Sequence, residues 1–270
     1  MARFAAGLEY DGRAYKGWQF QPGLNTVQGV IQDALSRVAD SPLETVCAGR
    51  TDAGVHASAQ VLHFDSEAAR GERAWRLGAN TYLPNDVSVL WVREVPAQFH
   101  ARFSATARSY RYLILNRDSR PGLDAGRATW ERRPLDHERM HACAQVLVGE
   151  HDFSAFRAIE CQSKSPVRRV ERVSVTREGD WVRVDITANA FLHHMVRNVA
   201  GLLMAVGEGD SPSERVAAVL ESRDRKVNAP TAPPDGLYLA GVRYPAEFGL
   251  PAVAEPQSAM IQRSPARTTS

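Results

Sequence analysis

The segment CAGRTDAGVHA, residues 47–57, holds the side chains of this chain whose types and spacing could do chemistry. Arg50, Asp52 and His56 lie close to two glycines, Gly49 and Gly54. Glycine is used where the backbone turns tightly or lets another group approach. A nearby cation favours an ionised carboxylate, which is the form that a nucleophile or a general base needs. The loop therefore presents either a reactive aspartate or an Asx-turn, in which the Asp52 side chain bonds only local backbone.

Several enzyme classes that use such residues find no support elsewhere in the chain. An aspartic protease needs Asp-Thr-Gly or Asp-Ser-Gly twice, and this chain has Asp-Ala-Gly once. Residues 12–17 have the glycine spacing of a P-loop, but Trp18 follows where lysine belongs. There is no Gly-x-Ser-x-Gly elbow. No second carboxylate stands out as the general acid that a retaining glycosidase requires.

Two adjacent histidines, His193 and His194, stand in the segment HHMVRN. We expect this segment inside a helix, where neighbouring residues point in different directions. The metalloprotease pattern His-Glu-x-x-His is absent. The sequence therefore predicts no metal site at the histidine pair, and it offers no other set of metal ligands.

Hydrophobic periodicity predicts the elements that must position these residues. Alternating apolar residues over 3–10 predict a strand before the polar loop. A helix is expected from Asn25, with Gln28 as its capping-box partner, and a strongly apolar helix over 191–206. Further strands are expected over 61–64, 87–92, 109–115, 170–176, 181–186 and 236–244, and further helices over 136–148 and from Ser211.

Composition indicates a globular protein of 270 residues, with 44% hydrophobic and 24% charged residues. The net charge of +2 does not by itself indicate a nucleic-acid partner. All but three of the 33 basic residues are arginine, which suits phosphate contacts but also fits a compositional bias. The three scattered cysteines favour a reducing cytoplasm. The N-terminus lacks a signal-peptide core, and no apolar run has the length of a membrane span.

The same strand and helix pattern occurs in each half of the chain. We therefore expect an N-terminal α+β domain over 1–105, which carries the Asp52 loop, and a C-terminal α+β domain over 106–248. From 249 to 270 the chain turns to Pro, Ala, Ser, Gln and Thr, which predicts a disordered tail.

Five segments resemble, in order, the sequence blocks of the tRNA pseudouridine synthases of the TruA type. Together they cover the chain from about residue 3 to residue 245 and are far more specific than any one motif. The segments are LEYDGRAYKGWQFQ (8–21), CAGRTDAGVHA (47–57), FHARFSATARSYRYLILN (99–116), GEHDFSAFRA (149–158) and NAFLHHMVRNVAG (189–201).

The resemblance implies roles for four residues. Asp52 matches the catalytic carboxylate, which attacks C1′, removes the C2′ proton to give a glycal, or adds to C6 of the base. Tyr110 matches a tyrosine that stacks on uracil, although a core position also fits its strand. Arg197 matches the ion-pair partner of the aspartate, although an exposed helix arginine fits the pattern too. Arg50 matches a residue that holds the target nucleotide out of the stack, with phosphate contact as the alternative.

The same resemblance implies the activity and the partners. The family isomerises uridine to pseudouridine at positions 38, 39 and 40 of the tRNA anticodon stem-loop, without a cofactor or a metal. It works as a homodimer that takes tRNA across both subunits, so a near-neutral subunit can still present a basic groove. The side chains expected to contact RNA phosphates are Arg102, Arg108, Arg111, Lys164, Arg168 and Arg169.

The implied fold class is α+β, the pseudouridine-synthase fold, in which two sandwich-like subdomains with mostly antiparallel sheets join around a central cleft. Two other functions stay open at this point. An RNA-binding protein without activity would be expected to lack Asp52 or its partner, and both are present. An unrelated aspartate-nucleophile enzyme would leave the other four segments unexplained.

Overall fold

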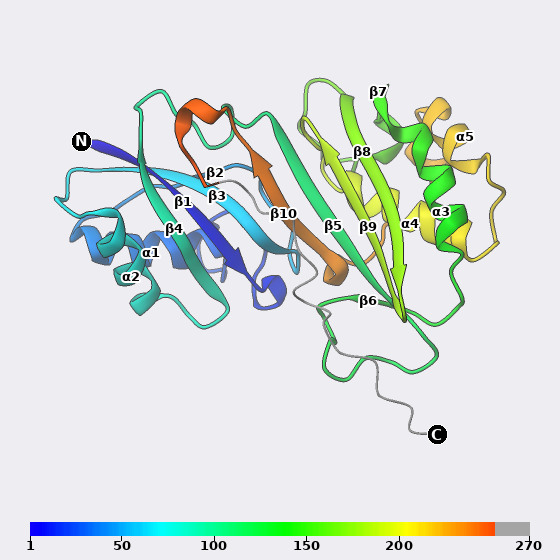
Figure 1. Ribbon diagram of the computed structural model, residues 1–270, viewed down its shortest axis with the longest axis horizontal. Helices are drawn as coiled ribbons and strands as arrows, with labels where there is room; N and C mark the ends of the chain where they lie inside the picture. The colour runs from blue at the N-terminus through cyan, green and yellow to red at the C-terminus, as the bar shows by residue number, and fades with distance from the viewer. Residues whose placement is uncertain (252–270) are drawn as a thin grey trace.

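The computed structural model describes residues 1–251 of the chain, and its framework is one mixed sheet of ten strands (Figure 1). The strand order is β4-β1-β3-β10-β5-β9-β8-β7, with β2 paired to β3 and β6 paired to β5. Only the β10–β3 and β5–β6 pairs are parallel among these strands. The strands are β1 (Ala2–Tyr10), β2 (Val46–Cys47), β3 (His56–Ser66), β4 (Val87–Val95), β5 (Ala107–Asn116), β6 (Thr129–Glu131), β7 (Gly149–Asp152), β8 (Val167–Glu178), β9 (Trp181–Ala188) and β10 (Leu237–Arg243).

Two groups of helices pack against the two ends of this sheet (Figure 1). The first group consists of α1 and α2. Trp75 of α2 packs on Phe4 and Phe64, at ring-centroid distances of 5.6 and 4.9 Å, and so ties this group to β1 and β3. The second group, α3, α4 and α5, belongs to the C-terminal half. The helices are α1 (Val27–Ala39), α2 (Glu72–Tyr82), α3 (His137–Ala144), α4 (Met195–Gly207) and α5 (Arg215–Ser222).

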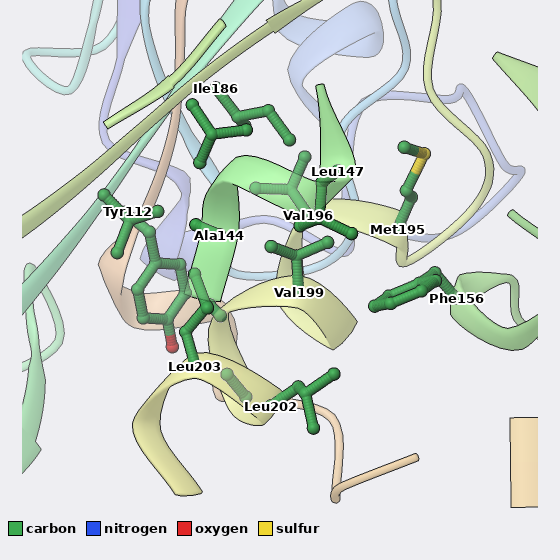
Figure 2. Close-up of a cluster of buried hydrophobic side chains, with 14 of the residues drawn as sticks. Tyr112, Ala144, Leu147, Phe156, Ile186, Met195, Val196, Val199, Leu202 and Leu203 are labelled. Atoms are coloured by element: carbon green, nitrogen blue, oxygen red, sulfur yellow. The ribbon is translucent and has the colours of Figure 1, made fainter. Parts of the chain in front are cut away.

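Each helix group has its own buried core. Figure 2 shows the C-terminal core, where α4 places Val196, Val199 and Leu203 beside Tyr112 and Ile186 of the strands. Full burial of such an aliphatic side chain contributes about 1.5–3 kcal/mol to stability. Helix α4 is therefore fixed by its apolar face, which gives a stable position to the polar residues at its N-terminal end.

The closing strand β10 joins the two halves. It pairs in parallel with β3 and antiparallel with β5, so the sheet is continuous across the expected boundary at residue 105. Its Leu237 belongs to the C-terminal core and its Leu239 to the N-terminal core. The division into domains 1–105 and 106–248 stays a prediction. Residues 252–270 of the expected tail lie outside the described part of the chain.

Three helix starts differ from the sequence predictions. Helix α1 is capped by Thr26, whose hydroxyl accepts from the Gly29 N–H, whereas Gln28 turns away to accept from the Phe20 N–H. Helix α4 starts only at Met195, because His194 takes a left-handed conformation with φ 62°. Helix α5 starts at Arg215, later than the Ser-Pro-Ser-Glu segment indicated.

The buried His63 of β3 should make the folding stability of the protein depend on pH. Its Nδ1 accepts from the Ala101 N–H at 3.1 Å. Burial, and then the charges of Arg3 and His100, lower the pKa of His63 to about 4. An ordinary histidine in the unfolded chain titrates near pH 6.5, so between about pH 6.5 and 4 the unfolded state binds more protons and stability falls as the pH is lowered.

The variant His63→Asn keeps an acceptor for the Ala101 N–H. Between pH 7 and pH 4.5 we expect its free energy of unfolding to fall by about 2 kcal/mol less than that of the wild type. Urea unfolding at the two pH values measures the difference. Parallel losses in the two proteins would show that His63 does not carry this pH dependence.

Candidate active site

The Asp52 loop runs between β2 and β3 and is anchored through its backbone on both sides. The Thr51 carbonyl accepts from the Trp18 N–H at 2.9 Å, and the Thr51 hydroxyl hydrogen-bonds that of Tyr10 at 2.8 Å. The Gln60 amide donates to the Gly49 carbonyl at 2.7 Å. Among the described residues, no backbone N–H donates to the Asp52 carboxylate, so the loop does not form the Asx-turn. The carboxylate is left for other partners.

Two glycines make this close anchoring possible. Gly54 has φ 79°, a left-handed conformation that other residues adopt at a cost. Gly17 has φ 88°, and a Cβ there would lie 2.9 Å from the Thr51 carbonyl oxygen. The loop therefore depends on a glycine outside its own segment as well as on one within it.

Three side chains from the C-terminal half meet the Asp52 carboxylate. Arg197 Nη1 lies 3.4 Å from Oδ2, and its Nε donates to the Ala232 carbonyl at 2.8 Å, which fixes the guanidinium. His193 Nε2 lies 3.2 Å from Oδ1, and His194 Nε2 lies 3.3 Å from Oδ2. The side chain of Asp52 is 26% exposed. The largely buried Asp52 carboxylate thus faces a fixed guanidinium and two imidazole rings.

The histidine pair corrects the sequence prediction. We expected the two rings to point apart within a helix, but both residues precede α4 and their rings lie 4.0 Å apart between centroids. The positive φ of His194 turns the backbone so that both rings reach Asp52. Asp52, His193 and His194 form a group whose ligand atoms all lie within 4.8 Å of one another, as a metal site requires. Burial lowers the pKa of His194, against the opposing pull of the Asp52 charge.

Tyr110 of β5 lies at the junction of the two cores and contacts both. Its ring packs edge-on against Phe191 at 4.9 Å between centroids, and its hydroxyl would lie 3.7 Å from a Cβ added at Gly49. Burial, together with the negative charge of Asp52, raises the pKa of the Tyr110 phenol. A neutral aromatic hydroxyl therefore sits beside the Asp52 loop.

Two other residues of the Asp52 segment, Arg50 and His56, have different surroundings. Arg50 is exposed. His56 is buried; its Nδ1 accepts from the Gly12 N–H, its Nε2 donates to the Gly126 carbonyl, both at 3.1 Å, and it stacks on Tyr238. His56 thus shapes the loop by tying it to two other segments, whereas Arg50 is available to a partner.

The six basic side chains that we expect to contact RNA differ in their surroundings. Arg108 donates to four backbone carbonyls, those of Ala48, Arg102, Ala105 and Asn189, so its guanidinium clamps the Asp52 loop instead of facing solvent. Arg111 follows Tyr110 on the strand and therefore points to the opposite face of the sheet. It is ion-paired there with Asp185 at 2.8 Å.

The other four do not share one environment. Arg168, near the start of β8, donates to the Ser165 and Val167 carbonyls and to the Ser163 hydroxyl, so its guanidinium is also held by protein groups. Arg102, Lys164 and Arg169 are exposed. Sequence alone could not separate these groups, because nothing in the pattern shows which acceptors a guanidinium will meet.

Within residues 1–251, no helix combines the length and apolar character that a bilayer crossing needs.

The chain has a mostly antiparallel α+β sheet and an aspartate loop that faces an arginine from the other half. It belongs to the tRNA pseudouridine synthase family. The model of that family, described as tRNA pseudouridine synthase, matches residues 6–104 and 143–245. Asp52 and Arg197 lie within the matched ranges, and Tyr110 lies between them. The chain therefore has the pseudouridine-synthase fold.

Individual relatives are similar over almost the whole chain. The tRNA pseudouridine synthase A of Methylococcus capsulatus is 60% identical over 248 residues, which is 92% of this chain and 92% of the relative. The protein of the same name from Legionella pneumophila strain Corby is 57% identical over 92% of this chain and 95% of its own length. That of Shewanella piezotolerans is 53% identical over 93% of this chain and 97% of its own length.

Proposed function

We propose that this protein is an isomerase that converts uridine to pseudouridine at positions 38, 39 and 40 in the anticodon stem-loop of tRNA. The observation that carries the proposal is the contact of Asp52 with Arg197, at 3.4 Å, in a chain of the tRNA pseudouridine synthase family. The similarity to enzymes named tRNA pseudouridine synthase A over more than nine-tenths of the chain supports the substrate class.

The reaction detaches uracil from C1′, turns it, and rejoins it through C5. A carboxylate can attack C1′, remove the C2′ proton to give a glycal, or add to C6, and each route needs Asp52 charged. Arg197 stabilises that charge by ion pairing. The sum of the steps exchanges a C–N bond for a C–C bond and moves one hydrogen from C5 to N1, so neither a redox cofactor nor water is consumed.

The target base must leave the stack before this chemistry, at a cost of about a few kcal/mol. We assign the stacking on the extruded uracil to Tyr110, and the position of its hydroxyl beside the Asp52 loop supports this role. The exposed Arg50 can fill the place that the base leaves or contact a phosphate.

The surface that we propose for tRNA binding uses cations that the structure leaves exposed. It comprises Arg50, Arg102, Lys164 and Arg169. Arg108, Arg111 and Arg168 are left out, because their guanidiniums are held by protein groups. We also propose a homodimer as the active form, which would add a second subunit's cations to a chain with net charge +2. The cytoplasm is the proposed compartment, in keeping with three free cysteines.

The activity test follows the hydrogen that C5 must lose. Wild-type protein incubated with tRNA that carries tritium at C5 of uridine should release tritium into solvent, and release should map to positions 38–40. A tRNA with cytidine at these three positions is the matched control and should release none. Tight binding of tRNA without tritium release would instead identify an RNA-binding protein without activity.

A further inference from the structure

The histidine pair gives the Asp52 site a property that the isomerisation does not use. His193 Nε2 and His194 Nε2 approach the carboxylate at 3.2 and 3.3 Å, one at each oxygen. The left-handed backbone at His194 sets the two rings side by side. Three ligand atoms of two types therefore converge on one small volume at the protein surface.

These separations fit a divalent transition metal. Zinc binds histidine nitrogen at about 2.0–2.1 Å and carboxylate oxygen at about 2.0–2.2 Å, so neighbouring ligands of a tetrahedral ion lie about 3.3–3.5 Å apart. The two nitrogen–oxygen separations, 3.2 and 3.3 Å, match this ligand–ligand distance within the movement of a side chain. Neutral imidazole and carboxylate are ligands that Zn²⁺ and Co²⁺ accept, and three protein ligands leave a fourth position for water.

We propose that Asp52, His193 and His194 form a three-ligand site for a divalent ion of the Zn²⁺ class, and that this ion inhibits the enzyme. The inhibition rests on the proposed function, since it arises because the metal occupies the carboxylate that must react with the ribose or the base. Binding requires an unprotonated Nε2 on each histidine. When the metal binds, a neutral ring that carries its proton on Nε2 changes to the tautomer with the proton on Nδ1. A doubly protonated ring releases one proton to solvent.

Arg197 limits the affinity of the site for a metal ion, and replacing it gives a test of the site. Its fixed guanidinium, 3.4 Å from Asp52 Oδ2, repels a dication bound to the same oxygen. Replacing it with the uncharged Arg197→Met should therefore tighten metal binding while turnover collapses. A site that merely depended on intact local structure would weaken in that variant.

The test uses Co²⁺ as a spectroscopic probe, with no tRNA present. Titration of the wild type should produce the visible absorption of tetrahedral Co²⁺, and His193→Gln and His194→Gln should each weaken binding by about 10-fold or more. His137→Gln, which changes a histidine at the start of α3, is the matched control and should bind as the wild type does. Cys161→Ser should also leave the spectrum unchanged, which shows that the Cys161 thiolate is not a ligand.

The second arm measures tritium release with added Zn²⁺, each variant being compared with its own activity in chelator. Zn²⁺ should inhibit the wild type reversibly, and His193→Gln should need about 10-fold more Zn²⁺ for the same fractional loss. Equal Co²⁺ affinity in wild type and the His193→Gln/His194→Gln double variant would overturn the site. Full activity at Zn²⁺ concentrations that displace bound Co²⁺ would overturn the inhibition, whereas absence of activity in chelator would count against the proposed function alone.

Discussion

Asp52→Asn should lower the rate of tritium release from C5-labelled tRNA by about 10⁴-fold or more, while the affinity for tRNA changes only a few-fold. The amide has the shape of the carboxylate but neither its charge nor its ability to attack carbon or to take a proton. The loop should keep its conformation, because its anchors are the Thr51 backbone and hydroxyl and the Gly49 carbonyl.

Two comparisons separate this effect from a loss of folding. Asp33→Asn removes an exposed carboxylate of α1, 62% exposed, and should leave turnover unchanged. Thermal unfolding of Asp52→Asn should occur close to the wild-type temperature. Turnover within about 10-fold of the wild type would remove Asp52 from the reaction, whichever of the three chemical routes is considered.

The sequence located the loop and its partner but not the two histidines. Asp52, Tyr110 and Arg197 were named from the family blocks, and the structure brings them together from β5, α4 and the β2–β3 loop. His193 and His194 were placed within a helix because the apolar spacing extends back to Phe191. The left-handed conformation of His194 ends that helix early, and it leaves no mark on the hydrophobic pattern.

Local patterns predicted most strands and most helices, but not the short strands β2, β6 and β7 and not how the elements assemble. Helix α2 was missed, since its start is a glycine without a side-chain cap and only Trp75 and Ala79 are buried. The placement of β10 between β3 and β5 was also beyond the pattern. That pairing depends on contacts between residues more than 100 positions apart, whereas periodicity reports only which face of an element is buried.

Arg197→Met should leave tRNA binding within a few-fold of the wild type and lower turnover by about 10²–10³-fold. The side chain is 15% exposed and its guanidinium bridges the Ala232 carbonyl and the Asp52 carboxylate, so it makes few contacts that RNA could use. Without it, Asp52 loses the one permanent positive charge that residues 1–251 bring within hydrogen-bond range, and the imidazoles must compensate its charge.

Arg197→Lys distinguishes charge from geometry. A lysine keeps the charge, but its single nitrogen cannot serve both Ala232 and Asp52 as the Nε and Nη1 of arginine do, so turnover should recover only in part. Arg37→Met, which changes an exposed arginine of α1, is the control for a general loss of positive charge. Single-turnover rates at saturating tRNA, measured beside tRNA affinity, decide the outcome. Weaker binding with normal saturated turnover would place Arg197 in the RNA-binding surface, and the charge of Asp52 would then depend on the histidines.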